Sequence, residues 1–264
     1  MFQEQLGNDI IEASHKRIDA PDKSVYFNHI HKHCEILLFI SGKANYNIDG
    51  QIFRPNPYEL LLIPSATYHY LIPTEENPYE NYVIGIMPEF IKEEHYKKLF
   101  SPPYMISVGD NEEVIRFFER LDFYKANYSK EDFELSARAL IKELITFLYY
   151  KKDSLAVAST TANAHINAVV SYIATNVEKP LNAAVIAAAL HLSEAYLQNL
   201  FSKEMHIGLK RYIMQKKVYA AHSDLLRGQS PAAVAAKYAF GDYSIFFRIY
   251  KSTFGTAPKC AKKR

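Results

Sequence analysis

The stretch that most constrains the fold is residues 238–258, which read YAFGDYSIFFRIYKSTFGTAP. Asp242 can cap a helix at its start. Apolar residues then recur at three- and four-residue steps and predict an inward face made of Ile245, Phe246, Ile249 and Tyr250. Gly255 is a stop signal, and Pro258 prevents continuation. The stretch therefore predicts an amphipathic helix of about three turns, whose polar, basic outer side fits a DNA major groove.

An internal duplication extends this pattern. Residues 181–205 repeat the order helix, tight turn, helix of residues 230–254, and a long helical pattern at 209–226 separates the two. The C-terminal part is therefore predicted to be all-α, with helix-turn-helix units at about 182–204 and 230–254. One rigid helix between them would place the recognition helices about one DNA turn apart, so that a single chain can read two successive major grooves.

The last of these units resembles the second helix-turn-helix signature of the AraC/XylS family of bacterial transcription regulators. The residues that match the signature are Ala235, Phe240, Asp242, Ser244, Phe246, Arg248, Lys251, Gly255 and Pro258. Ala239 and Tyr250 replace the Gly and Phe that are usual there, and Lys217 replaces an Arg of the middle helix. His206 stands where a Gly normally ends the first recognition helix, and we expect it to end that helix because His tolerates a left-handed conformation.

The exposed faces of the two recognition helices supply the candidate DNA contacts. Ser193 is the expected cap of the first, on which Gln198 and Asn199 can pair with adenine. We expect Lys203 to meet phosphate, and Arg248 to take a guanine or clamp a phosphate. With the positions that the resemblance marks as groove-facing, the predicted DNA-binding residues are Ala195, Gln198, Asn199, Lys203, Tyr243, Ser244, Arg248 and Lys251. The alternative for each is an ordinary solvated helix face, because sequence does not separate base contacts from phosphate contacts.

Charge is divided unevenly along the chain, although the formal net charge is only +2. From Ala164 onward there are 14 Lys and Arg against 5 Asp and Glu, whereas the preceding residues carry 17 against 24. This asymmetry indicates a polyanion partner for the basic part, here double-stranded DNA.

Cysteine usage and hydropathy argue against a disulfide-stabilised, zinc-cysteine, secreted or membrane-spanning protein. Cys34 and Cys260 are the only cysteines and fall in different predicted domains, so there is neither a disulfide framework nor a zinc-type cysteine spacing. No run of 18 apolar residues occurs, and the N-terminus lacks the basic-then-apolar order of a signal peptide. We therefore expect a cytoplasmic protein without a membrane partner.

The N-terminal part has the pattern of an antiparallel β-domain. From Val25 to about Met87, short runs rich in Tyr, Phe and Ile alternate with turn residues, which predicts an antiparallel barrel or sandwich. Asp49 and Gly50 form the clearest hairpin signal. Residues 1–24 are weakly patterned, and we interpret them as a short lead-in strand or loop.

Helical patterns follow the predicted strands, a short one at 88–100 and two amphipathic ones at 110–127 and 129–152. The apolar side of the last consists of Leu135, Leu140, Ile141, Leu144, Ile145 and Leu148. Ser129 with Asp132 makes a variant of the capping box. The two longer helices should pack antiparallel and either cover the barrel or form a dimer interface; the family resemblance favours a homodimer.

A second resemblance concerns the predicted barrel. His29, His31 and Glu35, followed by Gly42, and then Pro64 with His69 resemble the two motifs of the cupin superfamily, with Lys23 and Ala66 where Gly is usual. On a strand His29 and His31 would point the same way, and three imidazoles with one carboxylate suit iron, manganese, nickel or zinc. Sensor barrels of the AraC/XylS family often keep such residues as polar lining for an organic effector. We therefore assign His29, His31, Glu35 and His69 to effector binding and expect no metal and no cofactor; further candidate lining residues are His33, Tyr46, Tyr68 and Tyr82.

The predicted fold class is α+β: an N-terminal antiparallel, cupin-like β-barrel with a helical dimerisation pair, then an all-α domain with two helix-turn-helix motifs. We place the barrel at 1–108, the helical pair at 109–152, a linker at 153–164 and the DNA-binding domain at 165–264. The predicted function is a non-enzymatic transcription regulator controlled by a small-molecule effector, such as a sugar or related polar metabolite, with RNA polymerase as a candidate partner. The alternatives are a cupin metalloenzyme fused to a DNA-binding domain, and a regulator controlled by a protein partner.

Overall fold

The computed structural model describes residues 1–7, 10–21, 26–109, 111–157 and 160–261. The chain divides into two compact units, Met1–Thr161 and Ala162–Arg264. Three sequence predictions fall outside the described residues. They concern Lys23, Val25 at the start of the predicted strand region, and residues 158–159 at the centre of the predicted linker.

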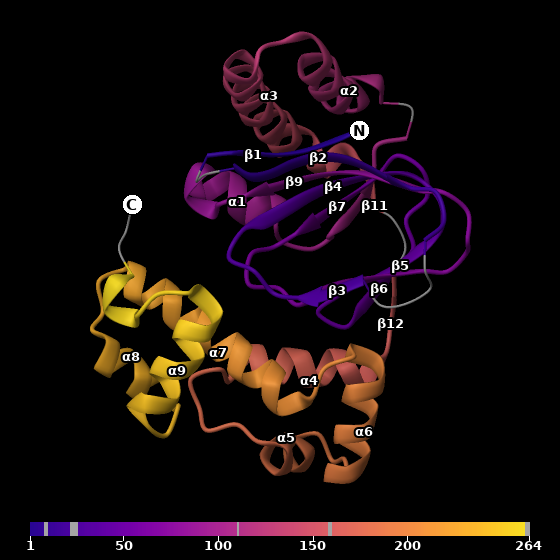
Figure 1. Ribbon diagram of the computed structural model, residues 1–264. Coiled ribbons are helices and arrows are strands. Elements are labelled where there is room, and N and C mark those ends of the chain that lie inside the picture. Colours follow the sequence, from indigo (N-terminus) through magenta and orange to yellow (C-terminus); the bar gives the residue numbers. More distant parts are fainter. Residues whose placement is uncertain (8–9, 22–25, 110, 158–159, 262–264) are drawn as a thin grey trace. The chain divides into compact units, whose positions relative to one another are not determined.

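The first unit contains two sheets, and the strand pairs between the described residues are antiparallel (Figure 1). The seven-stranded sheet has the order β1 (Phe2–Leu6), β2 (Ile10–Ile18), β9 (Tyr79–Ile86), β4 (Cys34–Ser41), β7 (Glu59–Ile63), β10 (Met105–Ser107) and β11 (Ala156–Val157). The five-stranded sheet has the order β12 (Thr160–Ala162), β6 (Gln51–Phe53), β5 (Ala44–Ile48), β8 (His69–Pro73) and β3 (Tyr26–His29). The fold is a two-sheet sandwich of the cupin-like kind rather than a closed barrel.

Burial on both faces explains the continuous apolar run of β4. Ile36 and Leu38 pack into a core shared with the helices, whereas Leu37 and Phe39 pack between the two sheets. Alternate residues of a strand point to opposite faces, so a strand covered on both sides needs apolar residues at nearly every position. The Asp49–Gly50 hairpin prediction is confirmed, because both residues have positive φ (44° and 87°) in the two-residue turn between β5 and β6.

Helices cover the outer face of the seven-stranded sheet (Figure 1). These helices are α1 (Glu93–Leu99), α2 (Glu112–Asn127) and α3 (Lys130–Lys151). A short 3₁₀-helix, η1 (Pro88–Phe90), precedes α1, and a second one, η2 (Lys152–Ser154), follows α3. Phe118 of α2 and Ile141 of α3 are fully buried against the sheet. The Ser129 side chain accepts a hydrogen bond from the Asp132 amide, as the capping prediction requires. Leu135, which we placed on the apolar side, is 71% exposed, so that expectation was wrong.

Two segments carry more strand than their sequence suggests. Residues 1–24 contribute both β1 and β2, and β2 pairs along its length with β9. Within residues 153–164, β11 pairs with β10 and β12 joins the five-stranded sheet beside β6. β11 and β12 have only two and three residues, which is too short for a periodic pattern, so they cannot be predicted from the sequence.

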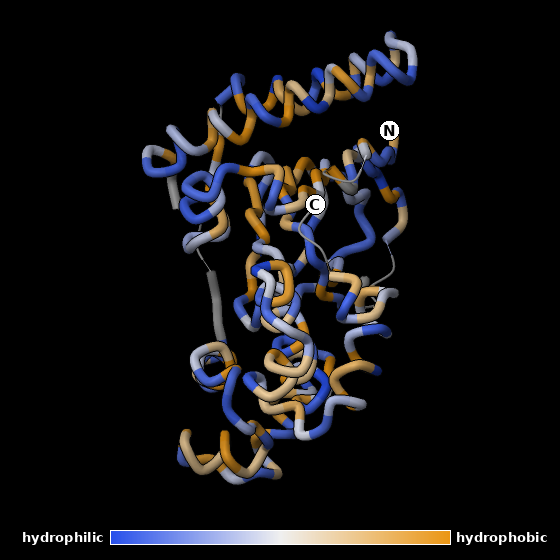
Figure 2. The backbone as a smooth tube through the Cα atoms, turned by 90° about the vertical axis from the view of Figure 1, so that its left-hand side faces the viewer, coloured by the Kyte–Doolittle hydropathy of each residue, from blue (hydrophilic) through white to orange (hydrophobic). Residues whose placement is uncertain are grey.

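The second unit is all-helical and duplicated, as predicted. Its elements are α4 (Ala164–Thr175), α5 (Ala183–Ala189), α6 (Glu194–Met205), α7 (Leu209–Leu226), α8 (Pro231–Lys237), α9 (Tyr243–Phe254) and η3 (Pro258–Cys260). The pairs α5–α6 and α8–α9 are the two helix-turn-helix motifs, and each pair has the same helix lengths, seven and twelve residues. Hydrophilic and hydrophobic residues alternate along these helices (Figure 2).

The two motifs also share their capping and turn devices. Ser193 and Asp242 each accept a backbone hydrogen bond at the start of a recognition helix. His206 and Gly255 end these helices in the left-handed conformation, which confirms the expectation for His206. The turn between the two helices of each motif also contains a residue with positive φ. It is His191 in the first motif (55°) and Ala239 in the second (49°).

A buried lysine ties α7 to the second motif. Lys217 is 1% exposed, and its Nζ donates at 2.7 Å to the carbonyl of Lys179 and at 2.7 Å to that of Tyr238, the residue that ends α8. Burial lowers the pKa of Lys217 from its usual value. This cation therefore satisfies one carbonyl at the turn before α9 and one in the connection between α4 and α5.

Replacing this lysine tests its role. We expect Lys217→Met, which keeps the length of the stem and removes the donor, to lower the free energy of unfolding of the second unit by about 1 to 3 kcal/mol, because the carbonyls lose their partner. The control Lys210→Met, at an exposed position of the same helix, should change it by less than about 0.5 kcal/mol. Urea unfolding at neutral pH measures both, and equal values for the two variants would contradict the assigned role.

The turn of the second motif holds a second test. Ala239 has φ 49°, which explains why glycine is usual in the matched signature. We expect Ala239→Gly to raise the free energy of unfolding by about 0.5 to 1 kcal/mol, because the left-handed conformation is costly for a residue with a Cβ atom. The same change at exposed Ala236, inside α8, should lower it by about 1 kcal/mol. Thermal or urea unfolding measures both variants. A loss of stability in both would show that the backbone of Ala239 is not strained.

Candidate functional site

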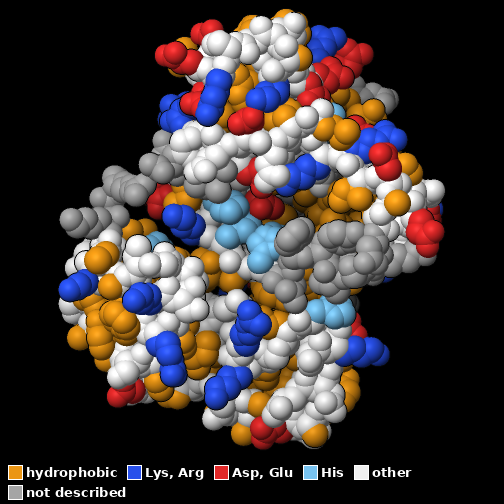
Figure 3. Space-filling view, viewed as in Figure 1, with side chains coloured by type: hydrophobic (Ala, Val, Ile, Leu, Met, Phe, Trp, Pro, Cys, Tyr) orange, Lys and Arg blue, Asp and Glu red, His pale blue; other side chains and the backbone are white. Residues whose placement is uncertain are grey.

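The first candidate site is the exposed face of α6 and α9. All the residues predicted to contact DNA are solvent-exposed, and the set is Ala195, Gln198, Asn199, Lys203, Tyr243, Ser244, Arg248 and Lys251. The Gln198 amide donates to Glu194 Oε1 at 2.9 Å, so it is already oriented within the helix face. Lys and Arg side chains lie across the visible face of the second unit with few acidic ones between them (Figure 3).

The inward face of α9 is narrower than the sequence pattern indicated. Phe246 and Tyr250 are fully buried, but Ile245 is 37% exposed, so its assignment to the inward face was wrong. Phe247, also 37% exposed, holds the position in α9 that Gln198 holds in α6, since both helices have twelve residues. Sequence reasoning missed Phe247, and aligning the two recognition helices residue by residue would have found it.

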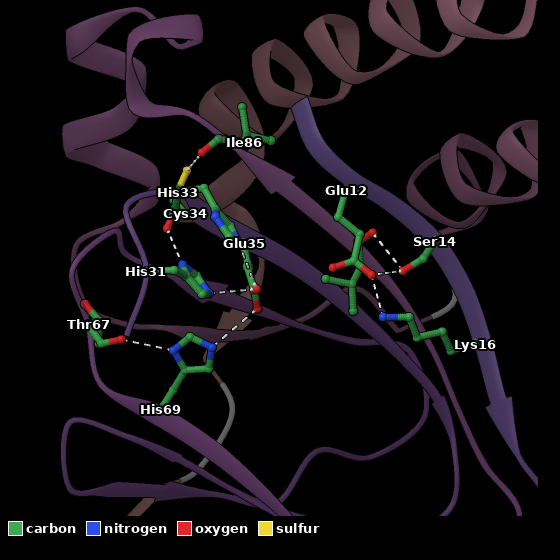
Figure 4. Close-up of polar contacts among 11 residues, drawn as sticks. Glu12, Ser14, Lys16, His31, His33, Cys34, Glu35, Thr67, His69 and Ile86 are labelled. Carbon is green, nitrogen blue, oxygen red and sulfur yellow. Dashed lines mark hydrogen bonds and ion pairs between the residues drawn. The ribbon is translucent and has the colours of Figure 1, made fainter. Parts of the chain in front are cut away.

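The second candidate site lies inside the β-sandwich. His29, His31, Glu35 and His69 each offer one ligand atom, and these atoms all lie within 4.8 Å of one another. His29 ends β3 and lies directly opposite His69 at the start of β8. Glu35 comes from β4 of the other sheet. His31 lies in the connection after β3, not on the strand as we expected, and its ring nevertheless points toward the Glu35 carboxylate (Figure 4).

Histidines surround the Glu35 carboxylate at short range. Nε2 of His31 lies 2.9 Å from Oε1, Nε2 of His33 lies 3.4 Å from the same oxygen, and Nε2 of His69 lies 3.6 Å from Oε2. Burial by itself would raise the pKa of Glu35, but the contacts with His31 and His33 hold it well below its usual range. Burial lowers the pKa of His69 to about 4. At neutral pH the site therefore contains a carboxylate and at least one neutral imidazole.

His33 has a supporting position in this cluster. Its ring stacks on that of His31, with centroids 3.5 Å apart. The space for the ring comes from Gly85, where a Cβ atom would lie 2.9 Å from Cδ2 of His33. His33 thus holds the His31 ring and the Glu35 carboxylate in place.

The three tyrosines proposed as lining residues lie in different surroundings. Tyr46 is buried between the sheets, where its hydroxyl contacts that of Tyr79. Tyr68 is fully buried. Tyr82 faces the helices, where its hydroxyl donates to Asp122 of α2, so the interpretation of Tyr82 as a lining residue was wrong.

A polar row on β2 adjoins the histidine cluster and was not predicted. Glu12 pairs with Gly85, which pairs with Glu35, so these residues face the same side of the sheet. Ser14 donates to Glu12 at 2.9 Å, and Lys16 forms an ion pair with Glu12 (Figure 4). The alternation of polar residues in IIEASHKRI is the signal that would have found this row.

The sandwich interior therefore brings polar and charged side chains close together. Imidazole, carboxylate, ammonium and hydroxyl groups converge on one end of it, and the same imidazole and carboxylate atoms are suited to a metal ion. Among the helices of the described ranges, none is both long and apolar enough to cross a membrane.

Two known families match the two units. The AraC-like ligand binding domain matches residues 14–143, and a helix-turn-helix domain matches residues 186–264. The chain is 24% identical to an uncharacterised HTH-type transcriptional regulator, YfiF, of Bacillus subtilis, over 92% of this chain and 84% of that one. It is 26% identical to the regulatory protein SoxS of Salmonella typhimurium over 38% of this chain and 94% of that one.

A solved structure also aligns over most of the chain. The crystal structure of ToxT from Vibrio cholerae, bound to a methylnaphthalenyl butenoic acid, is 14% identical, covers 96% of this chain and 97% of that one, and has a TM-score of 0.39. The two family matches agree with a ligand-binding sandwich domain followed by a helix-turn-helix unit. The chain belongs to the AraC family of DNA-binding transcription regulators that carry a ligand-binding domain.

Proposed function

We propose that the protein is a non-enzymatic regulator whose affinity for a DNA site is controlled by a small polar ligand bound inside the sandwich. DNA binding is supported by the duplicated motif, in which α6 and α9 have the same length, a side-chain cap at the start and a left-handed residue at the end, and both present exposed polar residues. Two such helices on one chain would enter successive major grooves. Gln198, Asn199 and Arg248 would read bases, and Lys203 and Lys251 would meet phosphates.

The polarity of the sandwich interior supports the class of effector. A sugar or related polar metabolite is the class that the family resemblance implies, and its hydroxyl groups could bond to the histidine cluster and to the row Glu12, Ser14 and Lys16. An apolar effector could not form hydrogen bonds with these groups. The rival of a metalloenzyme domain fused to the DNA-binding unit would require turnover of a substrate at the same cluster.

We also propose that α2 and α3 form the interface of a homodimer. The large apolar side chains Phe123, Leu135 and Tyr150 are 54%, 71% and 73% exposed on these helices. Exposed apolar residues on a paired helical surface are typical of an isologous interface. RNA polymerase is the proposed further partner of the DNA-bound regulator.

Two substitutions on α9 test the DNA contacts. With a duplex selected from a random library by the full-length protein, Arg248→Ala should cost about 1 to 3 kcal/mol of binding free energy and relax the preferred sequence. Lys251→Ala should weaken selected and random duplexes alike and reduce the salt dependence by about one phosphate contact. Both residues are exposed, so the melting temperature should stay the same.

Fluorescence anisotropy measures these affinities, and Arg116→Ala on α2 is the control for an equal loss of charge outside the DNA-binding unit. Unchanged affinity and sequence preference in Arg248→Ala would remove this residue from the readout.

The dimer is tested by charge on its proposed interface. Leu135→Glu should convert the protein to a monomer in analytical ultracentrifugation, because a carboxylate would be buried without a partner. Val185→Glu, at a position of α5 that is 40% exposed, makes the same chemical change in the other unit and should leave the oligomeric state as it is. A Leu135→Glu dimer as stable as the unmodified one would exclude this surface.

A further inference from the structure

We propose that Phe247 of α9 selects a thymine in the DNA site by apolar contact with the C5-methyl group of that base. The inference rests on the proposed DNA-binding function and adds to it a residue that determines specificity. Its first support is exposure. Phe247 is 37% exposed, although Phe246 and Tyr250 of the same helix are fully buried. The exposed ring is not isolated either, because its centroid lies 6.4 Å from that of Tyr243, which is 45% exposed.

The second support is the place of Phe247 on the helix. Residues three and four positions apart are neighbours on a helix surface, so Phe247 lies between Tyr243 and Ser244 on one side and Lys251 on the other. All three neighbours are exposed, and all three belong to the predicted DNA contacts. A recognition helix that brings these residues into the major groove therefore brings the Phe247 ring into the same groove.

The third support is a comparison of the two recognition helices. Both have twelve residues after a capping side chain, so their first and fifth positions correspond. In α6 these positions hold Glu194 and Gln198, and the amide donates to the carboxylate at 2.9 Å. In α9 they hold Tyr243 and Phe247, whose rings adjoin each other. The same two positions thus present a polar pair on one helix and an aromatic pair on the other.

The chemistry of the major groove assigns a base to each pair. An amide side chain such as that of Gln198 matches the donor and acceptor of adenine, whereas a phenyl ring has neither and matches the methyl group of thymine. Arg248, which follows the ring in the sequence, is suited to guanine. We therefore expect adenine in the half-site of α6, and thymine near a guanine in the half-site of α9.

This difference between the helices has a consequence for the DNA site of one chain. Although the two motifs are duplicates in length and capping, their half-sites are not interchangeable, because one is selected by hydrogen bonds and the other by an apolar contact. A single chain therefore binds its site in one orientation.

The test compares thymine with uracil, which lacks only the C5-methyl group. The full-length protein first selects a duplex from a random library. Each thymine of this duplex is then replaced singly by uracil, and fluorescence anisotropy measures the affinity. At one position or more, uracil should weaken binding by about fourfold, which corresponds to one buried methyl group. In Phe247→Ala the thymine and uracil duplexes should bind equally at that position.

Two further variants make the test specific to this ring. Phe247→Gln, which introduces the residue type that α6 has at the matching position, should prefer adenine where the unmodified protein prefers thymine. Ile245→Ala is the matched control, because Ile245 is also 37% exposed on α9 but lies about 200° around the helix axis from Phe247. It should keep the full loss of affinity with uracil. Circular dichroism checks that each variant is folded, and Phe247→Gln replaces Phe247→Ala in the comparison if the smaller side chain unfolds the helix.

Three outcomes would overturn the proposal: no thymine at which uracil weakens binding, an equal loss with uracil in the Phe247 variants, or a thymine preference that persists in Phe247→Gln. A Phe247→Ala protein that binds every duplex as the unmodified protein does would likewise exclude contact with DNA and leave the exposed rings to a protein partner. A protein that selects and binds a duplex without any methyl effect refutes this inference alone. A protein that selects no duplex refutes the proposed function, and the thymine contact with it.

Discussion

Burial of both faces of β4 is the constraint on which the first unit depends. Its even-numbered apolar residues contact the helices, and Leu37 and Phe39 contact the second sheet. A shift of one residue in the register would exchange these faces, and it would turn Glu35 out of the interior toward the helices. The same packing that stabilises the sheet thus fixes the position of the carboxylate.

The histidine cluster stabilises that carboxylate in the interior. A buried charge is costly unless it is paired, and Glu35 is 8% exposed with three histidine nitrogens close to its oxygens. Strand register brings His29 and His69 opposite each other, and Gly85 leaves room for His33. The site is therefore built from the two sheets together.

In the second unit, local contacts fix two short helices that each have a solvent-exposed face. Side-chain caps start α6 and α9, left-handed residues end them, and Lys217 and Asp224 of α7 bond to the turn and end of α8. Lys217 and Asp224 lie on the inner side of the motifs, where both are buried. The outer side, with Arg248 and Asn199, is left free to meet another molecule.

Sequence alone determined what depends on local pattern: the duplicated helix-turn-helix, the caps at Ser193 and Asp242, the Asp49–Gly50 hairpin and the choice of the four cluster residues. Caps and tight turns are set by a few neighbouring residues, so they can be predicted from spacing. Only the tertiary structure decided that Tyr82 faces the helices, that Ile245 is exposed, that β11 and β12 join the sheets, and that Glu12 and Glu35 lie on the same face of the sheet on either side of Gly85. These features depend on which strands become neighbours and which faces are covered, and long-range packing settles both.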